Sequence, residues 1–508
     1  MDHAVESSRL DKLHNIEKLG VDPWGQRFDG HQAIQKILEL PTDVPEDQRP
    51  SVKAAGRIVS RRIGGKVHWL DIRDWSGQLT TRKTTSDDDK HETTEFSDWS
   101  SRVQVMLGQK QIGELGWALA QELDLGDLVG IEGKFGKTKR GEPTIFAEKL
   151  TFLSKSLEPH PDKWAGMSEM EYRLRHRYLD LTYNPELLDI TLKRIKIVRR
   201  IRSYLDERGY CEVETPTLHA IAGGAAARPF KTHHNALDIP LFLRIALELH
   251  LKRLLVGGIE KVYEIGRVFR NEGISPKHNP EFTMMELYQA YGNYETMMEL
   301  TEGLIVACVD SLGNNRVLKW GDKAIDFTPP WQRAKYADLF REHVGVEMND
   351  EAGVMAAAQK THIDIKGKHH DVLVHELFEH KVESKLVGPV FVHDYPASLC
   401  PLTKRKVGMP NIAERFELYV HGMELANAYT ELNDPIMQEK TFSQQLAGLP
   451  EEDSMAKMDH DFIRAQRHGM PPAGGLGIGI DRLVMLLTNT QTIRDVILFP
   501  LLRPQAQG

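Results

Sequence analysis

Arginines, glutamates and a histidine crowd one short stretch, Gly266 to Leu287, which reads GRVFRNEGISPKHNPEFTMMEL. Arg270 and Lys277 offer positive charge to phosphate or carboxylate groups, whereas Glu272 and Glu286 offer negative charge to a cation or a metal ion. This mixture predicts a ligand that carries charges of both signs. The residues alone leave open a solvated hairpin with surface ion pairs.

A second charged cluster lies in RFELYVHGMELANAYTELND. A turn at residues 421–422 places Glu424 opposite Tyr419 and diagonal to Glu417, so the two carboxylates share one face of a strand pair. Paired carboxylates at that range suit Mg²⁺, a hard cation that takes carboxylate and phosphate oxygens. An amphipathic strand pair with an exposed acidic face is the alternative.

The polar residues that follow this pair are Asn427, Tyr429 and Glu431. Under strict alternation they fall on the face opposite Glu424. A site that uses both sets therefore requires a β-bulge between them.

A glycine-rich third cluster, PPAGGLGIGIDRLVMLL, leads into Asp481, Arg482 and an apolar helix. Glycines let a flat ligand approach the backbone, and a helix N-terminus with an arginine favours phosphate. The spacing matches neither a Walker A loop nor the dinucleotide fingerprint, and a tight strand-to-helix turn is the plain alternative.

Several elements must position these clusters. Residues 262–269 and 282–288 are rich in β-branched and aromatic residues and predict two strands of a hairpin. A preceding helix has apolar residues every three or four positions and ends near Gly209; these are Leu188, Leu192, Ile195, Val198, Ile201 and Leu205. Strands and helices then intermix without a regular βαβ alternation, which favours an α+β fold over a doubly wound one.

The pattern along the chain predicts an N-terminal helical arm over residues 1–48, a small β-barrel over 49–156 and a linker over 157–180. A larger domain follows over 181–508, with a helical insertion at about 329–385. The barrel segment carries clustered basic residues, which fit a docked polyanion or a solvated charged surface; these are Lys53, Arg57, Arg61, Arg62, Lys66, Lys134, Lys137, Lys139 and Arg140.

A short repeat interrupts the barrel segment. DWSG at 74–77 recurs as DWSS at 98–101, and the run between them is strongly polar. We interpret residues 78–101 as an insertion, too polar to form core, that makes a mobile loop.

Composition excludes several classes of protein. The 508 residues are 41% hydrophobic with a net charge of −8, and no apolar run approaches the ~20 residues that cross a bilayer. The charged start is unlike a secretory signal. Three scattered cysteines lack metal-ligand spacing and suit a reducing compartment. We expect a cytoplasmic protein with neither a disulfide framework nor a zinc site.

The order of the three clusters resembles the class II aminoacyl-tRNA synthetases of subclass IIb, and among them the lysyl-tRNA synthetase family. YLDERGYCEVETPTL looks like motif 1, GRVFRNEG with HNPEFTMMELY like motif 2, and GLGIGIDRLVML like motif 3. The resemblance runs from about residue 10 to 504. It implies an α+β catalytic domain built on an antiparallel sheet, and it makes the N-terminal barrel an OB-fold that binds the anticodon.

The resemblance also implies residue roles. Arg270 and Arg482 are the implied catalytic residues, and Glu417 and Glu424 the implied Mg²⁺ ligands. The implied ATP-binding residues are Arg270, Glu272, His278, Asn279, Phe282 and Arg482. The implied lysine-binding residues are Gly224, Glu248, Arg270, Glu286, Tyr288, Asn427, Tyr429 and Glu431. Trp69 and Gln104 are the implied anticodon contacts in the barrel, and Gln104 lies just after the second DWS.

By the same resemblance we expect activation of lysine with ATP, transfer to the 3′ end of tRNA(Lys) and a homodimer. Buried carboxylates favour a cationic side chain and disfavour an acidic one, which argues against an aspartyl or asparaginyl enzyme. A protein-lysylating enzyme and a catalytically idle RNA-binding homologue are the remaining alternatives. The barrel disfavours the former, and the intact arginines and glutamates disfavour the latter.

Overall fold

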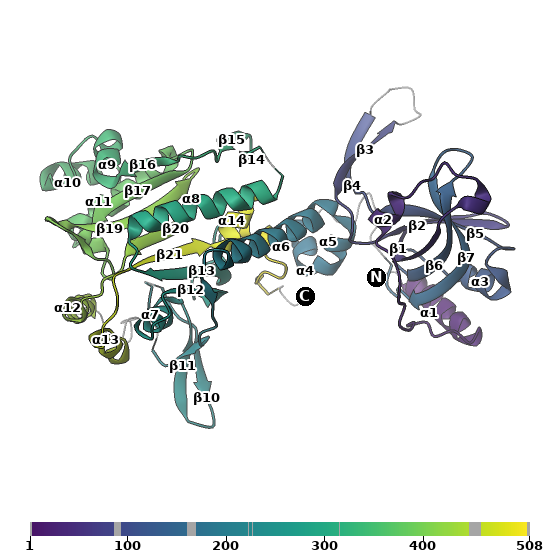
Figure 1. Cartoon of the computed structure of the whole chain (residues 1–508), viewed down its shortest axis with the longest axis horizontal. Coiled ribbons are helices and arrows are strands. Elements are labelled where there is room, and N and C mark those ends of the chain that lie inside the picture. The colour runs from purple at the N-terminus through teal and green to yellow at the C-terminus, as the bar shows by residue number, and fades with distance from the viewer. Residues whose placement is uncertain are drawn as a thin grey trace. The chain divides into compact units, whose positions relative to one another are not determined.

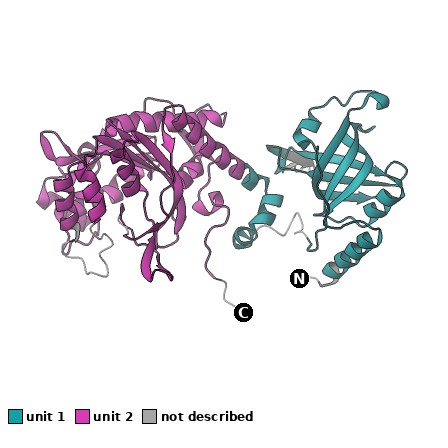
Figure 2. Ribbon diagram, turned by 60° about the horizontal axis from the view of Figure 1, so that its bottom comes forward, with its two compact units in different colours: residues 1–189 teal, residues 190–508 magenta. Residues whose placement is uncertain are grey.

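The computed structural model describes residues 3–85, 93–159, 169–221, 223–225, 227–313, 315–446 and 459–504. These residues form two compact units, 1–189 and 190–508 (Figure 2). Among the described helices, none is long and apolar enough to cross a membrane.

The N-terminal unit is built on a closed five-stranded barrel in the order β1-β2-β5-β7-β6, so the predicted barrel is confirmed. Buried residues alternate with partly exposed ones along β2, as expected for a strand with one face on a core. The strands are β1 (Ser51–Ile63), β2 (Val67–Arg73), β5 (Arg102–Gly108), β6 (Leu128–Lys137) and β7 (Pro143–Ser154). Around them lie α1 (His3–Lys18), α2 (Ile34–Leu38) and α3 (Gly113–Gln121).

The polar insertion forms a β-hairpin arm where a loop was expected. β3 (Leu79–Thr85) pairs antiparallel with β4 (Thr93–Trp99), and residues 86–92 lie outside the described residues. Strand pairing needs backbone hydrogen bonds and suits the threonine-rich sequence, so low hydrophobicity did not prevent it. The two DWS repeats meet at the base of the arm, where Asp74 N donates to Ser101 O at 3.3 Å. β5 pairs in register with β2 despite the insertion.

The predicted linker, 157–180, contains α4 (Met170–Arg175) and the start of α5 (Arg177–Tyr183), while its residues 160–168 lie outside the described residues. Asp180 is fully buried and accepts hydrogen bonds from Arg173 and Arg177, each at 2.9 Å. This ion-paired cluster explains why a polar sequence forms two consecutive helices here.

The C-terminal unit contains a nine-stranded, mostly antiparallel sheet, which confirms the predicted α+β class (Figure 1). Its order is β16-β17-β19-β20-β21-β13-β12-β8, with β18 added beside β19. The strands are β8 (Cys211–Glu212), β12 (Lys261–Phe269), β13 (Glu281–Ala290), β16 (Gln332–Lys335), β17 (Val390–Pro396), β18 (Arg405–Lys406), β19 (Met409–Val420), β20 (Met423–Thr430) and β21 (Ala473–Gly479). The predicted hairpin is confirmed as β12 and β13, with Phe269 paired to Glu281.

Smaller sheets and helices complete this unit. Outside the main sheet lie β9 (Leu218–His219), β10 (Lys231–His234), β11 (Ile239–Leu243), β14 (Val317–Trp320) and β15 (Lys323–Asp326). The helices are α6 (Pro185–Asp206), α7 (Glu248–Val256), α8 (Tyr294–Ser311), α9 (Tyr336–Val344), α10 (Glu351–Lys360), α11 (His370–Lys381), α12 (Pro435–Leu446), α13 (His460–Arg467), α14 (Ile480–Leu487) and α15 (Ile493–Val496). Helices α9 to α11 fall in the stretch for which a helical insertion was predicted.

The two faces of the main sheet have different roles. Met285 and Leu287 of β13 pack in one core with Ile201 of α6 and Leu304 of α8, whereas Glu286 and Tyr288 point to the opposite face. Along β21, Gly475, Gly477 and Gly479 fall on that opposite face, while Leu476 and Ile478 join the core. The sheet therefore buries one face under α6 and α8, whereas α7 covers the other face only over β12 and β13 and leaves part of it free to form a site.

Candidate active site

A cavity of about 460 Å³ opens on this free face, between the β12–β13 hairpin, β20, β21 and the start of α14. It is lined by most of the residues that the sequence analysis assigned to ATP, lysine or metal, whatever their separation in the sequence. These are Gly224, Glu248, Arg270, Glu272, His278, Asn279, Phe282, Glu286, Tyr288, Glu424, Asn427, Tyr429 and Arg482.

A β-bulge brings Glu424 and Asn427 to the same wall. Leu418 pairs with Ala426 and Tyr419 pairs with Glu424, so Leu425 is an extra residue in β20. The turn before it is the predicted one, with positive φ at both His421 and Gly422. The extra residue reverses the alternation after Glu424, and the bulge that a shared site required is present.

One end of the cavity is lined with carboxylates and tyrosines. Glu286 accepts hydrogen bonds from Leu247 N at 3.0 Å and from the Tyr288 hydroxyl at 3.2 Å. The Tyr429 hydroxyl donates to Glu248 Oε2 at 3.0 Å. Glu248 and Glu286 are each at most 5% exposed. A dry wall of negative charge favours a cationic ligand group.

Glu431 lies immediately behind this wall and is fully buried. A β-carbon on Gly475, which lines the cavity, would overlap the Glu431 carboxylate and the Tyr288 ring. Glycine at 475 thus lets Glu431 approach the cavity floor. Its Oε2 forms an ion pair with Lys252, a fully buried side chain that also pairs with Glu248.

These crowded carboxylates hold protons more tightly than ordinary glutamates. Burial and the nearby charge of Glu248 raise the pKa of Glu286 to about 7. Burial likewise raises the pKa of Glu431 to about 8, although Lys252 opposes the rise. Glu286 and Glu431 are each influenced by nearby carboxylates, so the protons belong to the cluster as a whole. A ligand that brings positive charge displaces them.

The other end of the cavity is cationic. Arg270 follows β12; it lies over the Phe282 ring at 5.2 Å and donates to Ile245 O at 3.4 Å. Arg482 donates to Glu424 O at 2.9 Å, and its Nη2 lies 3.2 Å from His278 Nε2. Burial and Arg482 lower the pKa of His278, so a neutral ring faces the guanidinium. This end suits phosphate oxygens and a flat ring.

Asn279 and Glu272 occupy the loop between β12 and β13. Asn279 Nδ2 donates to Glu281 O at 2.6 Å, which leaves its buried Oδ1 without a hydrogen bond among the described residues. A buried acceptor without a partner indicates a missing donor, such as an amino group of a ligand. Glu272 is exposed at the rim.

Asp481 and Arg194, which were not assigned a role from the sequence, connect the elements at this end of the cavity. Asp481, at the start of α14, accepts hydrogen bonds from Arg194 of α6 at 2.5 Å and from Thr283 N of β13 at 2.7 Å. This buried link fixes α14 against the hairpin and so positions Arg482.

The two assigned metal ligands differ in accessibility. Glu417 is buried, pairs with Arg415, and accepts hydroxyl hydrogen bonds from Tyr395 at 2.8 Å and Tyr419 at 2.5 Å. Although burial opposes ionisation, these partners hold its pKa below the ordinary value. The structure places Glu417 behind the cavity wall, with its oxygens already engaged.

Glu424 does line the cavity, and its side chain is 43% exposed. Its enclosure and the neighbouring charge of Glu417 raise its pKa, which indicates negative charge that a cation would offset. Among the described residues no group of three acidic, histidine or cysteine side chains could hold a metal alone. Mg²⁺ commonly takes one or two carboxylates together with phosphate oxygens, so Glu424 fits such an ion.

Trp69 and Gln104 come together on the outer face of the barrel. β2 and β5 pair so that Asp71 is opposite Gln104, and Trp69 is the next residue on the same face. Buried His68 and Leu70 point inward, so Trp69 is not a core residue. Gln104 Oε1 accepts a hydrogen bond from Thr144 at 3.0 Å.

Sequence reasoning missed Lys252, Arg194 and Arg415. Lys252 follows Glu248 by four residues, a spacing that on a helix such as α7 could have signalled an ion pair. Arg415 donates from Nε to Asn427 Oδ1 at 3.1 Å and also forms an ion pair with Glu417. The contact of Arg194 with Asp481 spans 287 residues and has no local sequence signal.

A mostly antiparallel sheet that carries a cavity with an arginine-lined end and a carboxylate-lined end agrees with a class II tRNA synthetase catalytic domain. Residues 169–503 match the family of tRNA synthetases class II (D, K and N), and the chain belongs to that family. Curated relatives narrow the assignment. A lysine–tRNA ligase of Moorella thermoacetica is 46% identical, covering 98% of each chain. Those of Syntrophomonas wolfei and Bacillus cereus are each 45% identical, covering 99% and 97% of this chain and 97% and 96% of their own. The chain thus falls among the lysine–tRNA ligases.

Proposed function

We propose that this chain activates L-lysine with ATP to give lysyl-adenylate and diphosphate, and then transfers the lysyl group to the 3′ end of tRNA(Lys). The observation that carries the proposal is the carboxylate end of the cavity, where Glu248 and Glu286 form a dry anionic wall backed by Glu431. An amino acid with a cationic side chain fits that wall, whereas aspartate is repelled by it.

Binding of lysine places its two ends in different surroundings. Its ε-ammonium is received by Glu286, Tyr288 and Glu431, with Asn427 and Tyr429 alongside. Its α-ammonium is received by Glu248 and the backbone at Gly224. Gly224 has a φ of +87° and lies against Ala246 and Glu248, so a side chain there would be strained. The α-carboxylate is then directed to Arg270.

Adenylate formation proceeds by in-line attack of the lysine carboxylate on the α-phosphorus of ATP. A new carboxyl–phosphate bond forms as the bond to diphosphate breaks, so no nucleophilic side chain is required. Arg270 stabilises the charge that develops at the α-phosphate, and Arg482 holds the adenine and γ-phosphate ends. Phe282 stacks on the adenine, while Asn279 and His278 contact the nucleotide and Glu272 lies at the rim.

Mg²⁺ would be held by Glu424 together with phosphate oxygens of ATP, with Glu417 adding negative charge from behind. Such an ion neutralises phosphate charge and supports the leaving diphosphate. The orientation of Glu424 itself comes from Arg482, whose guanidinium contacts both its backbone oxygen and its carboxylate.

Charging of a tRNA pool with labelled lysine, ATP and Mg²⁺ tests the proposal, with aspartate as the control amino acid. We expect charging with lysine and none with aspartate. Lysine-dependent exchange of diphosphate into ATP measures the first step separately. Absence of both reactions would contradict the assignment, and exchange without charging would locate the failure in the barrel or in transfer.

Two different results are expected for the two glutamates near the metal. Glu424→Gln should lower kcat/KM for diphosphate exchange by about 10²-fold and raise the Mg²⁺ concentration for half-maximal rate, because it removes the accessible carboxylate. Glu417→Gln should instead destabilise the fold by about 3–5 kcal/mol, because Arg415 loses its buried partner. Magnesium titrations and thermal melts distinguish them. Equal magnesium requirements in both variants would contradict these separate roles.

The barrel is proposed to hold the anticodon loop of the tRNA. Trp69 offers a partly exposed ring for base stacking and Gln104 offers an amide on the same face. Polar and aromatic groups side by side on a barrel face suit a single-stranded loop.

Trp69→Ala should lower kcat/KM for tRNA charging by about 10- to 100-fold, because one base stack is worth about 1–3 kcal/mol. Diphosphate exchange without tRNA should not change. Trp75→Ala is the matched control, since Trp75 is 71% exposed and follows β2 without lying on the paired face. Equal effects of the two variants on charging would argue against stacking at Trp69.

A homodimer and a cytoplasmic location complete the proposal. The short edge strand β8 and exposed Ile195 of α6, at 49%, offer backbone and apolar surface for a second copy. The three cysteines are free, which suits a reducing compartment. Sedimentation of the purified chain measures the oligomeric state.

A further inference from the structure

Lys252 is a buried cation at the floor of the carboxylate end. Its side chain is 0% exposed, and its ammonium forms ion pairs with Glu248 on the same helix and with Glu431 just beyond β20. The rings of Tyr288 and Tyr429 lie 5.8 and 5.6 Å from its Nζ. Carboxylates and aromatic rings together stabilise an alkylammonium group.

Lys252 is anchored by the geometry of α7. Glu248 and Lys252 are four residues apart, so they lie on one face of the helix and move together. Glu431 uses Oε2 for Lys252, whereas its buried Oε1 makes no hydrogen bond among the described residues and lies against Gly475. One carboxylate oxygen thus stays available at the cavity floor.

When Lys252 is included, the net charge of this cluster is equal and opposite to the net charge of lysine. With every group ionised, these three carboxylates outnumber Lys252 and the neighbouring Arg270, which lies between the two ends of the cavity, by one negative charge. Lysine brings two ammonium groups and one carboxylate, and its single net positive charge completes a neutral complex. The charged and titratable groups that face one another here are Glu248 and Lys252 of α7, Arg270 after β12, Glu286 and Tyr288 of β13, Tyr429 of β20 and Glu431.

We propose that Lys252 is a positioning and specificity-determining residue, a permanent counter-ion that holds Glu248 and Glu431 in place for the amino-acid substrate and remains paired when that substrate binds. This inference rests on the proposed function, because it takes lysine as the ligand. Lys252 does not touch the reacting atoms, and it acts through the two glutamates.

Ionisation of the cluster depends on this lysine. Burial alone would lower the pKa of Lys252, but Glu248 and Glu431 outweigh it and raise that pKa, so the ammonium stays charged. Without it the carboxylates repel each other and retain protons to higher pH. Lysine must then displace those protons from carboxylates that are no longer held in place.

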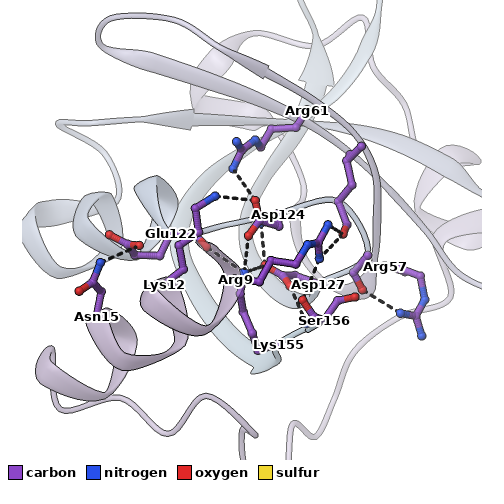
Figure 3. Close-up of polar contacts among 12 residues, drawn as sticks. Arg9, Lys12, Asn15, Arg57, Arg61, Glu122, Asp124, Asp127, Lys155 and Ser156 are labelled. Atoms are coloured by element: carbon purple, nitrogen blue, oxygen red, sulfur yellow. Dashed lines mark hydrogen bonds and ion pairs between the residues drawn. The ribbon is translucent and has the colours of Figure 1, made fainter. Parts of the chain in front are cut away.

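The chain offers a matched control in its other unit. Lys155 is also 0% exposed and lies between two carboxylates, 2.8 Å from Asp124 and 2.9 Å from Asp127 (Figure 3). It donates to Glu122 O at 3.1 Å and so ties the end of β7 to the segment before β6. Its surroundings match those of Lys252 in kind, but the structure assigns it no part of the cavity.

The test compares full-length wild type, Lys252→Met and Lys155→Met in lysine-dependent diphosphate exchange across pH. We expect Lys252→Met to raise the KM for lysine by on the order of tenfold or more, and to shift the pH midpoint of that KM upward by about one unit. The KM for ATP and the kcat at saturating lysine should change less than about threefold. Lys155→Met should lower the melting temperature and leave the KM for lysine and its pH profile unchanged.

Other outcomes would overturn the inference. A lower KM for lysine in Lys252→Met would mean that Lys252 competes with the substrate for the glutamates. An unchanged KM and pH profile would mean that it only supports the fold. Absence of lysine-dependent exchange in the wild type would instead reject the proposed function.

Two further measurements test the proposal if Lys252→Met does not fold. Lys252→Arg keeps the charge, so its pH midpoint should stay at the wild-type value even if bulk weakens lysine binding. In the wild type, acylation of surface amines read by mass spectrometry should leave Lys252 unlabelled both with and without lysine. Labelling that appears on adding lysine would show displacement of the counter-ion and contradict the proposal.

Discussion

Arg270→Gln lowers kcat/KM for lysine-dependent diphosphate exchange by about 10³-fold in our expectation, while the protein stays folded. The guanidinium lines the cavity between the carboxylate end and the cationic end. Burial lowers its pKa, although Glu272, Glu286 and Glu424 oppose that effect. In the proposed reaction this donor, in dry surroundings, meets the charge that develops at the α-phosphate. Its hydrogen bond to Ile245 O is long, at 3.4 Å, so its loss removes little structural support.

Arg267→Gln is the control for that variant. Arg267 lies on β12, three residues before Arg270, is 44% exposed, and pairs with Glu281 across 3.7 Å at the surface. It should leave exchange kinetics unchanged, because an exposed pair contributes little. Single-turnover kinetics separate binding from chemistry for Arg270→Gln. A drop of less than tenfold, or a drop confined to the KM for lysine, would contradict charge stabilisation in the transition state.

The affinity for lysine should rise by about 10³-fold between pH 6 and pH 8.5. In the substrate-free protein the pKa of Glu286 is about 7 and that of Glu431 about 8, so the cluster holds protons that an ammonium group must displace. Each proton released makes binding about tenfold tighter per pH unit below the pKa. Binding therefore strengthens as the pH rises through this window and levels off above it.

Without substrate, the stability of the fold changes with pH in the opposite direction to the affinity for lysine. These carboxyls hold protons more tightly in the folded chain than in the unfolded chain, so unfolding releases protons and the free energy of unfolding falls as the pH rises from about 4.5 to 8. Lysine reverses this loss. The shift in melting temperature that lysine causes should consequently grow with pH.

Calorimetry in two buffers of different ionisation enthalpy counts the protons directly. Wild type should release at least part of a proton per lysine bound at pH 7, and Glu286→Gln should release fewer because one titrating carboxyl is gone. Lysine binding that neither releases protons nor depends on pH would contradict the raised pKa values of this cluster.

Local patterns in the sequence predicted the elements that carry the site. The strands 262–269 and 282–288 are found as β12 and β13, and the helix before Gly209 is found as α6. Both follow from hydrophobic periodicity and turn residues, which act over a few positions. The pairing of Tyr419 with Glu424 was also predicted correctly from a two-residue turn.

What the sequence could not supply depends on partners far along the chain. Glu417 was assigned as a metal ligand next to Glu424, but its carboxylate oxygens accept a hydrogen bond from Tyr395 and form an ion pair with Arg415. The arm formed by β3 and β4 was expected to be a loop, because polarity excludes a core without excluding strand pairing. Glu431 was assigned to lysine binding, but its approach to the cavity floor over Gly475 and its ion pair with Lys252 have no local sequence signal.

The extra residue in β20 reverses which face of the sheet each following side chain occupies. Glu424 and Asn427 face one cavity because Leu425 adds one position between the paired residues. If the bulge were lost with Leu425 still in place, strict alternation would turn Asn427 and Tyr429 into the apolar core and present Ala426 and Ala428 to the cavity. Deleting Leu425 would instead leave Glu424 and Asn427 two positions apart and on the same face. Substitutions in this segment can change one contact at a time, but a one-residue slip of its register exchanges the whole wall at once.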